Sequence, residues 1–118
     1  MNILERNKEM IIARKAGESS VVLSKRYGVD QGSLSKAFYE YEYLIDKPYY
    51  DVVAGMNFSN QVGIKLVNLL HKYECMNNVD LTLETIKDIP RYQFHVLRGA
   101  GVSIMEAFDR LQEALRNG

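Results

Sequence analysis

The segment Tyr27-Gly28-Val29-Asp30 constrains the fold of this 118-residue chain more than any other stretch of its sequence. Gly28 can adopt the positive φ that ends a helix, here one of about two turns. Asp30 can accept hydrogen bonds from the first backbone N–H groups of the next helix, which is expected over residues 31–44. In that helix the spacing of Leu34, Phe38, Tyr41 and Ile45 forms a single apolar stripe that can be buried. The segment therefore predicts two helices joined by a very short turn.

The residues around this turn have the sizes and polarities that a helix-turn-helix motif needs. Val29 can plug the turn, and Ser24 is small enough to sit where the two helices approach each other. Apolar side chains that can lock the crossing are present at Leu23, Tyr27, Leu34 and Phe38. The alternative interpretation is a generic helical hairpin, in which the same apolar residues simply form the core.

Apolar spacing and capping signals predict that the rest of the chain is helical too. Further helices are expected over residues 3–16, 61–73, 82–88, 90–98 and from 103 onward. Gly17 is expected to end the first of them in a left-handed conformation, and Ser103 with Glu106 has the spacing of a capping box. The pattern predicts a first domain at residues 1–47, a connection at 48–60 with room for an irregular helical piece near 50–54, and a second domain at 61–118.

The composition limits the class of protein. Fifteen Lys and Arg residues balance fifteen Asp and Glu residues, which argues against a histone-like protein that binds nucleic acid through bulk charge. Cys75 is the single cysteine, so no intrachain disulfide can form and a reducing compartment is expected. No apolar run is long enough to span a bilayer, and the N-terminus is too charged for a signal peptide. We therefore expect a cytoplasmic protein with no membrane partner.

Residue types that carry catalysis or bind metals form no recognisable pattern. His71 and His95 are far apart in the sequence and are expected near the surface, whereas Cys75 is expected to be a small buried residue. The chain contains neither a phosphate-binding loop nor a nucleophile motif. We expect no enzymatic activity, no cofactor and no metal.

The second helix of a helix-turn-helix can lie in the major groove of DNA, with its first residues facing the bases. Its outward positions in this chain would be Gln31, Gly32, Ser33, Ser35, Lys36 and Tyr39. Gln31 could pair with adenine, and Lys36 with guanine or a phosphate. Further phosphate contacts are expected from basic residues nearby, at Arg14, Lys15, Lys25 and Arg26. Alternatively, each charge is simply solvated, and the tyrosines of this helix suit a protein interface as well as DNA.

Two resemblances extend this interpretation. The stretch RNKEMIIARKAGESSVVLSKRYGVDQGSLSKAFYEYEYL resembles the helix-turn-helix of region 4 of bacterial sigma factors, in its order of basic helix, glycine, helix, Tyr-Gly-Val and recognition helix. Residues 61–118 are more faintly similar to the C-terminal domain of the RNA polymerase alpha subunit, and LRGAGVSIMEAFDRLQEAL matches its helix-hairpin-helix. The second resemblance implies that a DNA phosphate is held by Gly99, Gly101, Val102 and Ser103. The alternative is a plain turn between two helices.

Together these features predict an all-α protein, with an N-terminal helix-turn-helix followed by a small helical bundle that contains a helix-hairpin-helix. A chain that joins two such modules resembles accessory transcription factors of Gram-positive bacteria and their phages. The resemblance implies a regulator that binds double-stranded DNA, with a homodimer or the second module adding specificity. The alternatives are a module that binds RNA polymerase or another host protein through the same fold, and a purely structural subunit.

Overall fold

The computed structural model describes residues 2–118, including every side chain in that range except that of Asn60. Over these residues the chain is all-helical, as the sequence predicts, and contains no strand. It divides into an N-terminal unit, Met1–Lys47, and a C-terminal unit, Pro48–Gly118. Within the described range, no helix combines the length and the apolar character needed to cross a membrane.

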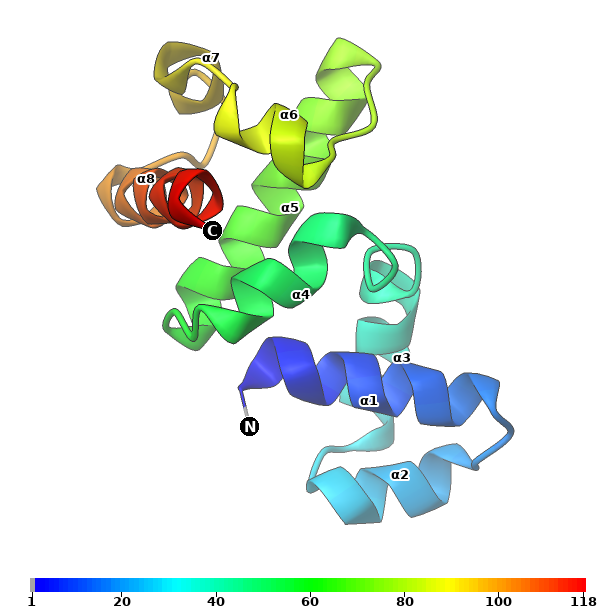
Figure 1. Ribbon diagram of the computed structural model, residues 1–118. Coiled ribbons are helices and arrows are strands. Elements are labelled where there is room, and N and C mark those ends of the chain that lie inside the picture. The colour runs from blue at the N-terminus through cyan, green and yellow to red at the C-terminus, as the bar shows by residue number, and fades with distance from the viewer. Residues whose placement is uncertain (1) are drawn as a thin grey trace. The chain divides into compact units, whose positions relative to one another are not determined.

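Three helices make up the N-terminal unit: α1 (Ile3–Lys15), α2 (Ser20–Tyr27) and α3 (Gln31–Tyr41). Each of the three packs against the other two (Figure 1). Their buried apolar side chains are Leu4, Met10, Ile11, Leu23, Leu34, Ala37 and Tyr41. All three helices thus bury apolar side chains, whose removal from water is the main force that stabilises such a packing.

Polar caps and left-handed glycines set the ends of these helices. Ser19 accepts a hydrogen bond from the N–H of Val22 (3.2 Å) at the start of α2. Asp30 begins α3 by accepting one from the N–H of Ser33 (2.7 Å). Gly17 and Gly28 have φ values of 104° and 66°. The predictions for both glycines and for Asp30 are confirmed, and residues 28–30 form the short turn between α2 and α3.

The third helix is shorter than the sequence predicts, because it ends at Tyr41 rather than near Leu44. In the turns that follow, the carbonyl oxygen of Tyr41 accepts hydrogen bonds from the N–H groups of Leu44 (2.9 Å) and Ile45 (3.1 Å). Pro48 limits the backbone of Lys47 alone, so it does not explain an end seven residues earlier. The expected inward stripe survives in part: Leu34, Tyr41 and Ile45 are buried, but Phe38 is only half-buried.

The C-terminal unit contains α4 (Pro48–Gly55), α5 (Asn60–Asn77), α6 (Leu83–Lys87), α7 (Arg91–His95) and α8 (Val102–Asn117). The long helix α5 packs against α4 and α8, and α8 also packs against α6 (Figure 1). The rings of Phe94 and Phe108 stack with their centroids 3.9 Å apart and link α7 to α8. The buried amide of Gln112 donates hydrogen bonds to the carbonyl oxygens of Ile86 (3.1 Å) and Ile89 (2.8 Å). These contacts attach both short helices to α8.

The connection expected at residues 48–60 is wrong over most of its length, because the helical piece expected near residues 50–54 is a regular helix, α4, that spans Pro48–Gly55. Pro48 occupies the first helical position, where a missing N–H leaves no hydrogen bond unmade. The helix has a continuous buried face, at Tyr49, Tyr50, Val53 and Ala54. Only residues 56–59 connect α4 to α5.

Three smaller expectations about the C-terminal unit are also wrong. The last helix begins at Val102 with Gly101 as its N-cap and without a side-chain cap hydrogen bond, so Ser103 does not open a capping box. The extended backbone of Gly101 starts the helix instead, and its carbonyl oxygen accepts from the N–H of Met105 (2.9 Å). The fifth helix continues past residue 73 to Asn77, and it carries Cys75 on its exposed side rather than in the core.

Candidate functional site

The third helix presents a polar surface made of the residues expected to face DNA bases. All of the expected positions are exposed: Gln31, Gly32, Ser33, Ser35, Lys36 and Tyr39. The side chain of Tyr39 extends into solvent, with 86% of the residue's surface exposed. On the opposite side of the helix, Leu34 and Ala37 are buried, and α3 packs against α1 and α2. One face of α3 therefore packs against α1 and α2, and the opposite face is exposed and can contact a partner.

The cap of α3 reduces the number of groups that its first turn can offer to a partner. The N–H and the hydroxyl of Ser33 both donate to the Asp30 carboxylate, at 2.7 Å and 3.0 Å. These two hydrogen bonds hold the pKa of Asp30 below its ordinary value, with the backbone donor as the larger cause. A Cβ on Gly32 would come within 3.1 Å of the same carboxylate, so glycine leaves room for the cap. The side chains of Gln31, Ser35 and Lys36 remain available for contacts.

The basic residues expected beside α3 are all exposed, but two of them are already paired with acidic groups. The Arg26 guanidinium binds the Glu18 carboxylate through two contacts of 2.8 Å and 2.6 Å. This pairing raises the pKa of Arg26 and lowers the pKa of Glu18, mainly through the side-chain hydrogen bonds. The Lys15 ammonium lies 3.9 Å from the Glu42 carboxylate. Each of these pairs reduces the charge that would attract a phosphate.

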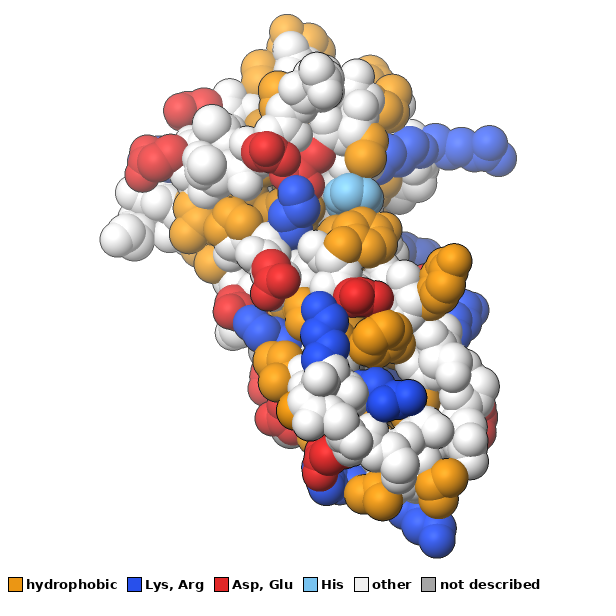
Figure 2. Space-filling model, turned by 90° about the vertical axis from the view of Figure 1, so that its right-hand side faces the viewer, with side chains coloured by type: hydrophobic (Ala, Val, Ile, Leu, Met, Phe, Trp, Pro, Cys, Tyr) orange, Lys and Arg blue, Asp and Glu red, His pale blue; other side chains and the backbone are white. Residues whose placement is uncertain are grey.

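Three basic side chains remain for an anionic partner. Within residues 2–118, Lys25 and Lys36 have no acidic partner, and Arg14 donates only a long contact (3.4 Å) to the backbone oxygen of Glu18. The N-terminal unit has eight Lys and Arg residues against seven Asp and Glu residues, a net charge of +1. Figure 2 shows basic side chains interspersed with acidic and hydrophobic ones on the face it presents, rather than one continuous basic surface. Any attraction to DNA must therefore come from a few well-placed groups.

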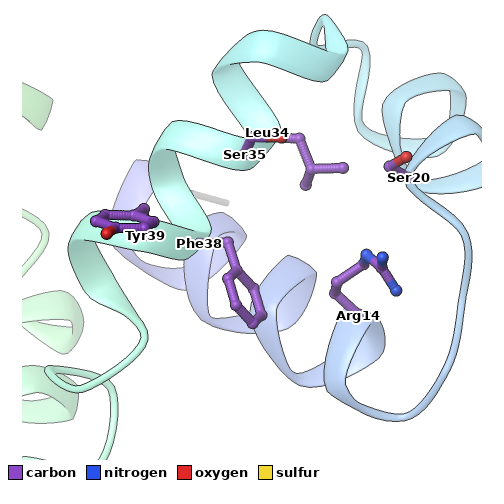
Figure 3. Close-up of a pocket in the computed structure, with 6 residues that line it drawn as sticks. All are labelled: Arg14, Ser20, Leu34, Ser35, Phe38 and Tyr39. Carbon is purple, nitrogen blue, oxygen red and sulfur yellow. The ribbon is translucent and has the colours of Figure 1, made fainter.

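A groove of about 420 Å³ lies between α3 and the ends of α1 and α2. It is lined by Arg14, Ser20, Leu34, Ser35, Phe38 and Tyr39. Figure 3 shows Leu34 and Phe38 extending from α3 toward the space that Arg14 enters from the end of α1. The groove continues the exposed face of α3, so Arg14 is placed to reach a ligand that docks along this helix.

A second candidate surface surrounds the turn between α7 and α8. Gly99 has a φ of 100°, and its carbonyl oxygen accepts a hydrogen bond from the N–H of Gly101 (3.0 Å). The four residues expected to hold a phosphate are all exposed: Gly99, Gly101, Val102 and Ser103. Because no side chain caps α8, the N–H groups of its first turn are open to an external acceptor.

This turn lines a groove of about 380 Å³ together with the start of α5. The α5 side of the groove is formed by Ser59, Gln61, Val62 and Lys65. Sequence reasoning missed Lys65, because only the packing of α5 against α8 brings this residue next to the turn. The groove therefore combines free N–H groups with one basic side chain.

Comparisons of this chain with protein-family models, with curated proteins and with solved structures gave no match. Within the part of the chain that the structure describes, no group of three His, Cys, Asp or Glu side chains is placed to hold a metal ion. The two exposed surfaces, on α3 and at the turn before α8, are therefore the candidate binding sites of this protein.

Proposed function

We propose that this protein is a transcription regulator whose N-terminal unit binds double-stranded DNA as a helix-turn-helix, with α3 in the major groove. The observation that carries the proposal is the exposed row of Gln31, Ser35 and Lys36 on a helix whose other face is buried. The three-residue turn with left-handed Gly28 between α2 and α3 supports this proposal, because such motifs need a very short turn. The major groove is about 12 Å wide and admits one helix held in this way.

The chemistry of each available side chain suits a particular contact with a base or a phosphate of DNA. The amide of Gln31 can donate to and accept from the edge of adenine, and the ammonium of Lys36 can donate to guanine or a phosphate. Lys25, at the end of α2, and Arg14, at the end of α1, can bind phosphates on either side of the groove. With about three phosphate contacts, the logarithm of the binding constant should fall against the logarithm of the salt concentration with a slope of about −3.

The C-terminal unit would add a second contact. In a helix-hairpin-helix, backbone N–H groups of the turn and of the following helix bind a DNA phosphate. The open N–H groups after Gly101, with Lys65 beside them, support this role for Gly99, Gly101, Val102 and Ser103. One recognition helix reads only a few base pairs, so the second module or a homodimer would supply the remaining specificity.

The test is selection of a binding site from random duplexes at low salt, followed by fluorescence anisotropy on the selected duplex. Gln31→Ala should weaken binding to that duplex by about 1–3 kcal/mol but leave binding to unrelated DNA unchanged. Lys36→Ala should weaken binding to the selected duplex. Lys87→Ala is the matched control, because it removes one positive charge that is already paired with Glu84 at 2.8 Å. Absence of any binding at low salt would eliminate the proposal.

A protein partner is the second candidate, with RNA polymerase or another host protein bound through the same face. It is favoured by the exposure of Tyr39 (86%) and Tyr43 (53%) together with the pairing of Arg26 by Glu18. Exposed aromatic side chains are typical of protein interfaces. In this case Tyr39→Ala should abolish capture of purified RNA polymerase, and added DNA should make no difference to the wild-type protein.

A further inference from the structure

The groove beside α3 combines an apolar lining with one basic side chain. Its volume of about 420 Å³ falls within the range of about 300–1,000 Å³ that is typical of small-molecule sites. The floor is the buried side chain of Leu34, and the ring of Phe38 extends from the same helix toward the same space (Figure 3). Phe38 is only half-buried, so part of its ring is open to a ligand in the groove.

The positive charge of Arg14, which enters this groove from the end of α1, is not neutralised by an acidic group within the described residues. The residues that line the groove include no Asp or Glu. The Arg14 guanidinium makes one long contact, 3.4 Å, with the backbone oxygen of Glu18. The Glu18 carboxylate is itself bound through both oxygens to Arg26. Arg14 is therefore available to a ligand, and a guanidinium is suited to bind a carboxylate through two parallel hydrogen bonds.

The hydroxyl groups of Ser20 and Ser35 line the groove as well. Neither hydroxyl makes a hydrogen bond to another residue within the part of the chain that the structure describes. Each can donate to an anionic oxygen or accept from a neutral donor. Small-molecule sites commonly have this composition, in which apolar surface supplies affinity and a few polar groups fix the orientation of the ligand.

The combination of an apolar wall and an unneutralised guanidinium selects a class of ligand. A small inorganic anion would pair with Arg14 but would leave the apolar surface exposed to water. A neutral apolar molecule would cover Phe38 but would shield Arg14 from water without giving it a partner, which costs free energy. We propose that the groove is a binding site for a small aromatic carboxylate, whose carboxylate pairs with Arg14 and whose ring packs on Phe38.

The test is a titration of the full chain with indole-3-acetate and with 2-naphthoate, followed by ¹H–¹⁵N NMR. The solution contains no DNA, so the result does not depend on whether Arg14 also contacts a DNA phosphate. We expect saturable shifts of the amide signals of the residues that line the groove, with a Kd on the order of 1 mM or lower for ligands of this size. The primary amides of both acids have nearly the same shape without the charge, and they should bind at least about tenfold more weakly.

Arg14→Gln should lower the affinity for both acids at least about tenfold and remove their preference over the amides. Arg98→Gln is the matched control, because it removes an exposed arginine of the C-terminal unit and should leave the affinity unchanged. The comparison of acids with amides on the wild type decides the matter if Arg14→Gln does not fold. Equal binding of acids and amides would overturn the proposal, because the groove would then be an apolar surface without a carboxylate site. So would an absence of saturable shifts at the groove, or a folded Arg14→Gln protein that keeps the wild-type preference.

Discussion

The turn between α2 and α3 can be tested by adding a single methyl group at Gly28. The φ of this residue is 66°, and a Cβ built on it would meet no atom within 4 Å, so Gly28→Ala changes the backbone energy without a clash. A left-handed conformation costs a residue with a Cβ about 1–2 kcal/mol. Alanine also reduces the conformational entropy of the unfolded chain relative to glycine, and this effect offsets about 0.4–1 kcal/mol of the cost. We therefore expect a net loss of about 1 kcal/mol, or roughly 10 °C in Tm for a unit as small as Met1–Lys47.

The assay is urea unfolding followed by circular dichroism, with hydrogen exchange measured by mass spectrometry to assign the loss to α1, α2 and α3. Gly28→Asn is the matched variant and should stay within about 0.5 kcal/mol of wild type, because asparagine tolerates left-handed angles. Gly55→Ala is the opposite control: Gly55 lies in α4 without a positive φ and has open space around it, so alanine should stabilise the C-terminal unit by about 0.4–1 kcal/mol. An unchanged or increased stability of Gly28→Ala would refute the reasoning.

Three further changes test the packing and the caps. Ser24→Ala should stabilise the N-terminal unit by about 1 kcal/mol in urea unfolding, because the Ser24 hydroxyl is buried and has no hydrogen-bond partner within the described residues; a destabilised variant would contradict this. The pKa of Asp30 is lower in the folded protein than in the unfolded chain. Its cap therefore stabilises the fold fully when the pH is above the ordinary aspartate pKa, and this stabilisation disappears as the pH falls through the folded-state pKa. Asp30→Asn should therefore weaken the acid dependence of stability between these two values, whereas an identical acid profile would be inconsistent with the cap. Phe108→Ala should cost about 3–5 kcal/mol in calorimetry of the C-terminal unit, since it leaves a cavity beside Phe94; a cost below about 1 kcal/mol would mean that the ring stack contributes little.

The parts of the fold that depend on local signals could be predicted from the sequence. Gly17 and Gly28 end their helices, and Asp30 begins α3, because a missing Cβ and a short carboxylate act within a few residues of their own position. For the fourth helix the sequence predicts only an irregular piece near residues 50–54, whereas α4 spans Pro48–Gly55. A proline is compatible with a helix when it occupies the first turn, and the buried faces of Tyr49 and Tyr50 show why this segment packs as α4.

The sequence predicts which residues of the candidate surfaces face outward. It does not predict which of their charges are paired with other groups. The pairing of Arg26 with Glu18 joins the last turn of α2 to a residue that precedes this helix, and no periodic pattern in the sequence predicts it. Lys65 reaches the turn before α8 only through packing of distant segments.

The salt dependence of binding to double-stranded DNA shows whether α3 contacts DNA through Lys36, and it is measured by fluorescence anisotropy for the wild type and for Lys36→Ala. We predict that the logarithm of the wild-type binding constant falls linearly with the logarithm of the KCl concentration, with a slope of about −3, and that Lys36→Ala binds more weakly with a slope smaller by about 1. Wild-type binding that does not depend on salt, or a Lys36→Ala protein with the affinity and slope of the wild type, would contradict the account.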